Sequence, residues 1–180
     1  MARQLIIMRH AKSAWDTDAL SDFDRPLAKR GMQDAPRMGQ WLQDNDLIPD
    51  FIVASPAQRA KETILAVCKV LEIKKKAVQW DGRIYGAGTE ELLEVLGEVP
   101  KGTKIVMIVG HNPGLEMLYS YLVERKAPEE SAFSEEMGVI KTATIAHLRM
   151  PDDWGRLAPG CATLTRLISP RELAGVSEAE

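Results

Sequence analysis

Three junctions in this chain place an arginine or a histidine near the end of a short apolar run. They hold Arg9 and His10 after the run 5–8, Arg59 shortly after the run 51–54, and His111 after the run 105–109. The guanidinium of arginine is a planar fork of donors that fits a phosphoryl group, and a neutral imidazole nitrogen can attack phosphorus near pH 7. Residues of these types in this arrangement indicate phosphoryl chemistry.

The junctions can act together only if the fold brings them to one place. Apolar runs predict strands at residues 4–8, 51–54, 77–80, 104–109, 142–149 and 162–168. Segments with helical spacing alternate with these strands, which is the pattern of a mostly parallel sheet between layers of helices. We therefore predict the α/β class, as a three-layer α/β/α sandwich whose strands end at one shared edge. The last two strands are expected to form an antiparallel hairpin at the side of the sheet.

Residue types also predict where the helices begin. A first helix over residues 28–44 contains Pro36, which is expected either to kink it or to mark a later start. Favourable N-terminal residues predict three further starts: Ser55 as N-cap with Pro56 first in the helix, Thr89 as N-cap, and Asn112 or Pro113 at the opening. The polar stretch 127–136 is expected to be a loop.

Length and composition predict one globular domain without a membrane segment. The chain has 180 residues, of which 45% are hydrophobic and 27% charged, and its net charge is −3. We expect a single domain over residues 1–180, with a flexible tail over about 176–180. No apolar run approaches the ~20 residues that span a bilayer, and no signal peptide is recognised. We therefore expect a cytoplasmic protein that binds neither membranes nor nucleic acid.

Other conspicuous residues have simpler explanations than chemistry. Cys68 and Cys161 are too few for a disulfide framework and are expected to be buried, reduced thiols. His147 lies inside an alternating strand and is expected to be structural or exposed. The histidines have no close pair and no neighbouring cysteines, so no zinc site is expected. The basic run 74–76 has no accompanying basic face and predicts a solvated turn.

Several motifs resemble the histidine phosphatase superfamily, which includes the phosphoglycerate mutases, and most closely its small SixA-like phosphohistidine phosphatase branch. They are Arg9-His10-Ala11-Lys12-Ser13, Ser21-Asp22-Phe23-Asp24-Arg25-Pro26-Leu27, Arg30-Gly31, Ser55-Pro56 with Arg59, Val109-Gly110-His111-Asn112-Pro113-Gly114 and Ser169-Pro170-Arg171-Glu172-Leu173. Together they extend over nearly the whole chain and are specific, whereas an Arg-His pair alone is a weak signal. The resemblance implies a phosphoglycerate mutase-like fold.

The resemblance also implies roles for individual residues. His10 would be the nucleophile that forms a transient phosphohistidine, Arg9 and Arg59 would clamp the phosphoryl group, and His111 would contact its oxygens. Arg25, Ser13 and the backbone amide of Asn112 would add substrate contacts. No metal or organic cofactor is implied.

The chain departs from the pattern of the family at three positions. Ala11 replaces the usual glycine after the histidine, which preserves a small residue at the turn. Asp16 stands where many relatives carry asparagine, and its carboxylate would weaken phosphate binding unless it faces away or pairs with an arginine. Gly86 stands where relatives that cleave phosphate esters place a glutamate as proton donor.

The missing glutamate favours one class of substrate. An alkoxide is a poor leaving group and needs a general acid, whereas the imidazole of a phosphohistidine is far less basic. We therefore expect a phosphatase that acts on protein phosphohistidine, such as that of a histidine phosphotransfer domain. Asp81, Glu90 or Glu91 could still supply the acid.

Two alternatives stay open. One is a small-molecule phosphomonoesterase or mutase with the same nucleophile, and the other is a phosphate-binding regulatory module without turnover. A monomer is the simpler expectation, because the sequence has no long exposed apolar stripe.

Overall fold

The computed structural model describes residues 2–123 and 140–177, and within them six strands form one sheet in the order β3-β2-β4-β1-β5-β6. The strands are β1 (Arg3–Arg9), β2 (Phe51–Ala54), β3 (Val78–Trp80), β4 (Ile105–Gly110), β5 (Ile145–Met150) and β6 (Thr163–Ile168). Strands β3, β2, β4 and β1 are parallel, while β5 runs antiparallel to both β1 and β6. The predicted mostly parallel sheet with a hairpin at its side is confirmed.

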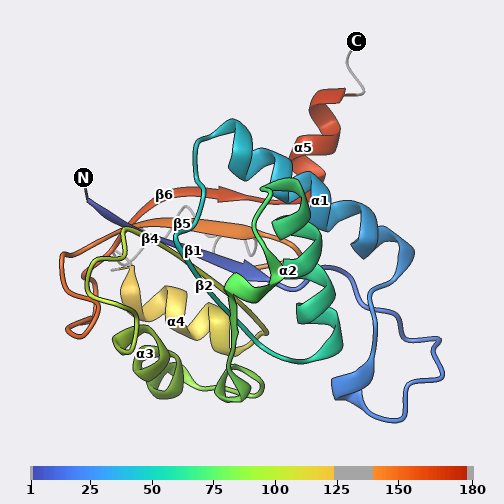
Figure 1. Ribbon diagram of the computed structural model, residues 1–180, viewed down its shortest axis with the longest axis horizontal. Helices are drawn as coiled ribbons and strands as arrows, with labels where there is room; N and C mark the ends of the chain where they lie inside the picture. Colours follow the sequence, from blue (N-terminus) through green and yellow to red (C-terminus); the bar gives the residue numbers. More distant parts are fainter. Residues whose placement is uncertain (1, 124–139, 178–180) are drawn as a thin grey trace, which may run out of the picture.

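Helices cover both faces of the sheet, as Figure 1 shows. They are α1 (Lys29–Asp44), α2 (Gln58–Val70), α3 (Thr89–Gly97), α4 (Gly114–Leu122) and α5 (Pro170–Ser177), with short 3-10 turns η1 (Asp22–Asp24), η2 (Lys75–Ala77) and η3 (Gly82–Ile84). Residues of α1, α2 and α5 pack on one face, and residues of α3 and α4 pack on the other. The three-layer α/β/α sandwich is therefore confirmed.

The central strands are apolar throughout because both of their faces are covered. Along β4, Met107 joins the core under α1 and α2, and the next residue, Ile108, joins the core over α3 and α4. Ile6 and Ile7 divide in the same way along β1, and all four side chains are fully buried. This alternation is the period of a strand, and burial on both faces removes the polar positions that a half-exposed strand would show.

Two predicted helix caps are wrong. Helix α2 begins at Gln58 with Ala57 as its N-cap, so Ser55 is not the N-cap and Pro56 is not the first helical residue. Helix α3 has Gly88 as its N-cap, whose amide donates to Oε2 of Glu91 at 3.0 Å, so the cap comes from a carboxylate inside the helix.

The remaining boundaries differ by smaller amounts. Helix α1 runs through Pro36 from Lys29, so a later start is wrong, and α4 begins at Gly114 after Pro113. Helix α5 includes residues 176 and 177 of the expected tail, while residues 178–180 and the expected loop 127–136 lie outside the described residues. Buried His147 shares a 2.6 Å hydrogen bond with Gln4, a structural role.

The two cysteines were both expected to be buried thiols, and this is confirmed for Cys68 but not for Cys161. Cys68 and Cys161 are both free, the first buried and the second half-buried. The part of the chain that the structure describes contains no helix long and apolar enough to cross a membrane.

The start of α1 is pressed against the loop that follows β1. The amide of Ala28 donates to the carbonyl oxygen of Lys12 at 2.8 Å. A Cβ atom at Gly31 would overlap that same carbonyl oxygen, so only glycine permits this approach. The contact places the first turn of α1 beside the residues that follow His10.

We expect Gly31→Ala to destabilise the protein by about 1–3 kcal/mol, although alanine is the better helix former, because the new methyl group meets backbone. Gly97→Ala is the matched control, since a Cβ atom at Gly97 has nothing within 4 Å and α3 should gain stability. Urea unfolding of both variants measures the difference. Equal stabilities would contradict the close approach of α1 to Lys12.

Candidate active site

The ends of β1, β2 and β4 bring the predicted residues to one edge of the sheet. Arg9 pairs with Gly110 across β1 and β4, and Ala54 pairs with Val109 across β2 and β4. The residues that follow these strands therefore emerge side by side. The ring centroids of His10 and His111 lie 5.1 Å apart, which places two imidazoles at the centre of the site.

The backbone around His10 fixes which of its ring nitrogens is basic. Nδ1 lies 2.8 Å from the carbonyl oxygen of Ala11, and a carbonyl only accepts, so Nδ1 carries the proton and Nε2 carries the lone pair. The amide of Ala11 donates to Oγ1 of Thr63 at 2.9 Å, and this hydroxyl donates to the carbonyl of Arg59 at 2.7 Å. The amide of Ala143, a residue with φ of 58°, donates to the carbonyls of both Arg9 and His10.

Burial keeps His10 uncharged. It lowers the pKa of His10 to about 3, and the positive charges of Arg59 and Arg9 act in the same direction. The ring is therefore neutral at pH 7, and its Nε2 lone pair is available as a nucleophile.

His111 is positioned by a serine from the neighbouring strand end. Its Nε2 lies 2.8 Å from Oγ of Ser55, which also accepts the amide of Ala57 at 3.2 Å. In the tautomer in which Ser55 donates to Nε2, the buried Nδ1 carries a hydrogen, and it has no partner among the described residues. Burial lowers the pKa of His111 to about 4, so this ring too is neutral at pH 7.

The two predicted arginine clamps each offer a buried donor. Nη1 of Arg9 donates to the carbonyl of Ile140 at 3.3 Å, and burial lowers the pKa of Arg9. Arg59 donates from Nη1 to the carbonyl of Asp22 at 2.6 Å and from Nη2 to its carboxylate at 3.0 Å. The Nε atoms of both arginines are buried without a hydrogen-bond partner in the described structure. Buried donors in this state are suited to an oxyanion.

A carboxylate that the sequence did not single out closes one side of the site. Asp22 contacts Arg59, lies 3.4 Å from Nε of Arg25, and accepts the hydroxyl of Tyr85 at 2.8 Å. The bonds from Tyr85 and then Arg59 lower the pKa of Asp22, so it stays ionised. The ring of Tyr85 meets that of His111 edge-on, with centroids 5.4 Å apart.

Two of the three predicted substrate contacts, Arg25 and Ser13, have protein partners; at the third, Asn112, the structure gives partners of the side-chain amide, whereas the prediction concerned the backbone amide. Arg25 donates from Nη2 to Oγ of Ser13 at 2.7 Å, and its guanidinium lies 3.6 Å from the centroid of a Trp15 ring. The side-chain amide of Asn112 donates to Glu116 and to the carbonyl of Ile140, which anchors the segment after residue 139. Nη1 of Arg25 is buried without a described partner, so this arginine still has one donor to offer.

The predicted substitute acids are engaged elsewhere or exposed. Asp81 pairs with Arg83 at 2.7 Å, and this bond lowers its pKa, which suits an ionised carboxylate rather than a proton donor. Glu91 caps Gly88 at the start of α3, and Glu90 is exposed beside it.

The three positions that depart from the motifs of the superfamily differ in their exposure to solvent. Gly86 adopts a φ of 72° with open space around it, and the side chain of Asp16 is exposed. Ala11 is fully buried at the turn. No group of three or more possible metal ligands occurs within residues 2–123 and 140–177.

The chain is similar to several known proteins. The model of the histidine phosphatase superfamily, branch 1, matches residues 5–82. Rv1276c, an uncharacterized protein of Mycobacterium tuberculosis, is 33% identical over 91% of this chain and 100% of its own length. Phosphohistidine phosphatase SixA of Escherichia coli is 28% identical over 71% of this chain and 76% of its own.

A solved structure extends the similarity to the whole fold. It is the structure of a proposed phosphohistidine phosphatase SixA from Nakamurella multipartitia, with a TM-score of 0.80 and 31% identity. The match covers 94% of this chain and 97% of that one.

We expect the ring signals of His10 and His111 in an NMR titration to stay those of neutral imidazoles at pH 5, with midpoints near 3 and 4. Because folding lowers both pKa values below 6.5, the unfolded chain binds protons more readily in this range. The stability contributed by the neutral rings is therefore present above about pH 6.5 and is lost as the pH falls towards 4. A midpoint near 6.5 for either ring would contradict its burial.

Proposed function

The chain belongs to the histidine phosphatase superfamily, and we propose that it removes the phosphoryl group from phosphohistidine in proteins. The observation that carries the proposal is the tautomer of His10, in which Nδ1 donates to the carbonyl of Ala11 and Nε2 is left basic. A histidine phosphotransfer domain is the type of partner that supplies such a substrate.

The proposed reaction has two displacements at phosphorus. Nε2 of His10 attacks the phosphoryl group in line with the leaving nitrogen, a P–N bond forms, and the P–N bond of the substrate breaks. The departing imidazole keeps the electron pair and takes a proton from solvent. Water then attacks the phosphohistidine at position 10, releasing inorganic phosphate and restoring the neutral ring.

The buried donors are the groups that would stabilise the charge on the transferred phosphoryl. Nε of Arg9 and Nε of Arg59 lack partners among the described residues, and so does Nδ1 of His111. Fixed donors in a site of restricted water access stabilise developing charge without reorganising. Nη1 of Arg25 is a further buried nitrogen without a hydrogen-bond partner among the described residues.

The carboxylates near the site support phosphohistidine over phosphate esters. Asp22 and Asp81 have lowered pKa values because they accept bonds from Tyr85 and Arg83 respectively. Neither is poised to protonate an alkoxide, whereas an imidazole leaves without such help. The names of the SixA relatives agree with this substrate class.

The test compares wild type with His10→Ala on a histidine-phosphorylated protein and on a simple alkyl phosphate. We expect wild type to dephosphorylate the protein much faster, and His10→Ala to lose turnover by about a thousandfold or more. Wild type should also acquire an acid-labile phosphate label that the variant lacks. Full activity of His10→Ala would remove the mechanism, and equal turnover of the alkyl phosphate would favour a small-molecule phosphomonoesterase.

We expect Ser55→Ala to lower kcat by about fivefold, because one buried hydrogen bond contributes about 1 kcal/mol to the position of His111. The KM value should change little, since Ser55 reaches substrate only through that ring. Ser120→Ala, at an exposed serine of α4, is the control and should retain full activity. Steady-state kinetics on the phosphorylated protein measures both, and an unchanged kcat in Ser55→Ala would refute the positioning role.

A further inference from the structure

A hollow lined by positively charged residues includes Arg9, at the edge of the sheet that carries the catalytic residues. Its volume is about 340 Å³, and its charged lining residues are Arg9, Lys12, Arg30, Lys141 and Arg171. No aspartate or glutamate is among the residues that line it. The chain as a whole carries a net charge of −3, so this local excess of cations runs against the overall balance. We call this hollow the basic pocket.

Four separate segments are fastened together to build the basic pocket. The close approach at Gly31 sets Arg30 beside Lys12. The amide of Ala143 ties the segment that holds Lys141 to the carbonyls of Arg9 and His10. Helix α5, which begins beside Arg171, packs against α1. The cluster therefore follows from the same contacts that position the nucleophile.

Arg9 connects the basic pocket to the catalytic site. It is the last residue of β1, directly before His10, and it lines the pocket as well. An anion bound in the pocket would therefore share Arg9 with the group transferred to His10. The substrate that fits both places carries a phosphoryl group and further negative charge close to it.

The exposure of the cations indicates what kind of anion this is. Lys12, Arg30, Lys141 and Arg171 are all exposed, and Arg30 also pairs with Asp34 at 3.4 Å. Small-molecule sites enclose their ligand and use a few fixed, buried polar groups. Exposed lysines and arginines around a hollow instead suit the charged rim of a protein interface, where they orient and attract the partner.

We infer that the basic pocket binds acidic side chains of the phosphorylated protein, on the surface next to its phosphohistidine. The inference rests on the proposed function, because it names what surrounds the substrate phosphoryl group. Carboxylates in the pocket would select among phosphohistidine proteins. The acidic surface would bind through the pocket while the phosphoryl group meets His10.

The experiment uses two synthetic phosphohistidine peptides that differ only in the flanking residues, glutamate in one and glutamine in the other. We expect wild type to show a kcat/KM about tenfold higher for the glutamate peptide, mainly through KM, and to lose this preference as salt is raised. Lys12→Ala/Arg171→Ala should treat the two peptides alike. Both side chains are exposed, so this variant should fold.

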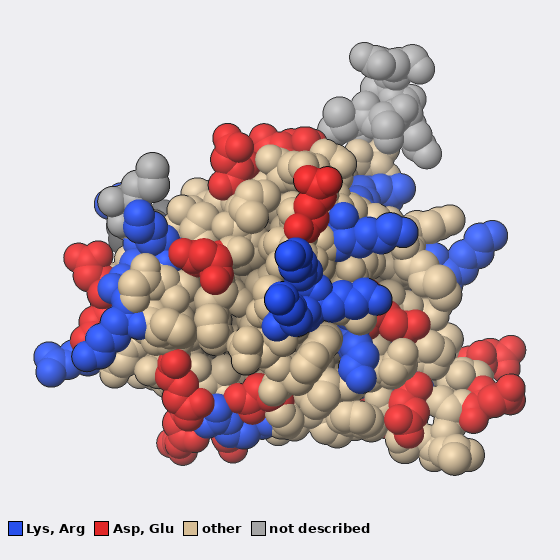
Figure 2. Space-filling view, in the orientation of Figure 1, with Lys and Arg blue, Asp and Glu red and all other residues tan. Residues whose placement is uncertain are grey.

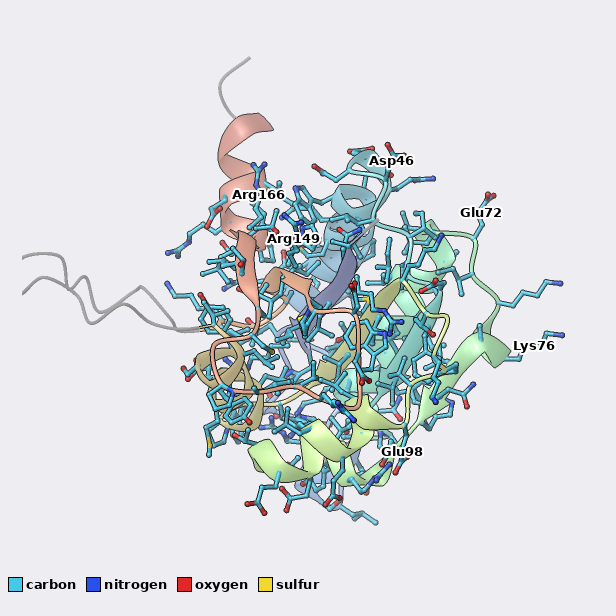
Figure 3. All side chains as sticks on the ribbon, turned by 90° about the vertical axis from the view of Figure 1, so that its left-hand side faces the viewer. Asp46, Glu72, Lys76, Glu98, Arg149 and Arg166 are labelled. Carbon is cyan, nitrogen blue, oxygen red and sulfur yellow. The ribbon has the colours of Figure 1, made fainter. Side chains whose placement is uncertain are left out.

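The matched control removes two charges near the opposite edge strand of the sheet. Lys75→Ala/Lys76→Ala changes η2, next to β3, whereas α5 follows β6 at the opposite end of the strand order. Figure 3 shows Lys76 directed away from the ribbon, and Figure 2 shows charges of both signs interspersed on one face of the molecule. This control should keep the wild-type preference for the glutamate peptide.

A binding measurement separates the two proposals. Fluorescence anisotropy of both peptides with His10→Ala reports recognition without turnover, and inorganic pyrophosphate is the competing anion.

Tighter binding of the glutamate peptide, lost when Lys12→Ala/Arg171→Ala is added, would support the pocket inference. If wild type at the same time hydrolysed neither peptide, the proposed function would fail while the pocket inference held. Hydrolysis and binding of both peptides alike would overturn the pocket inference alone. Displacement by pyrophosphate with no preference for glutamate would overturn it in favour of a second phosphate group on a small substrate.

Discussion

The hydrogen bond from Nδ1 of His10 to the carbonyl of Ala11, 2.8 Å long, is the interaction on which the chemistry of this site depends. A carbonyl cannot donate, so the bond assigns the proton to one ring nitrogen and the lone pair to the other. The amide of Ala11 is fixed in turn by Thr63, whose hydroxyl donates to the carbonyl of Arg59. These hydrogen bonds thereby link the orientation of the His10 ring to helix α2, which carries Arg59.

Burial lets the site hold two imidazoles and several guanidiniums in a small volume. If His10 and His111 were charged at neutral pH, they would repel Arg9 and Arg59 across short distances. Their pKa values of about 3 and about 4 remove that repulsion and leave the arginines as the source of positive charge. Asp22 balances part of this charge from the rim, where its carboxylate is half exposed to water.

The sequence allowed the sheet, its layers and the placement of Arg9, His10 and His111 to be predicted, because apolar runs on buried strands and residues at strand ends are local signals. The roles of Ser55 and Asp22 were missed, since each depends on partners far away in the chain. A serine before a proline is typical of a helix cap, and this local pattern hides the role of Ser55 in the site. Its true partner is His111, which lies 56 residues away. Local patterns do not report such pairings.

The left-handed backbone of Ala143 has a consequence for which sequences this fold accepts. Its φ of 58° costs a non-glycine residue about 1 kcal/mol, and a β-branched side chain would cost more. The residue is also fully buried, so bulky replacements lack room as well. The backbone at this corner, just ahead of the antiparallel strand β5, directs the amide of Ala143 to the carbonyls of Arg9 and His10. Few amino acids other than alanine and glycine meet both demands.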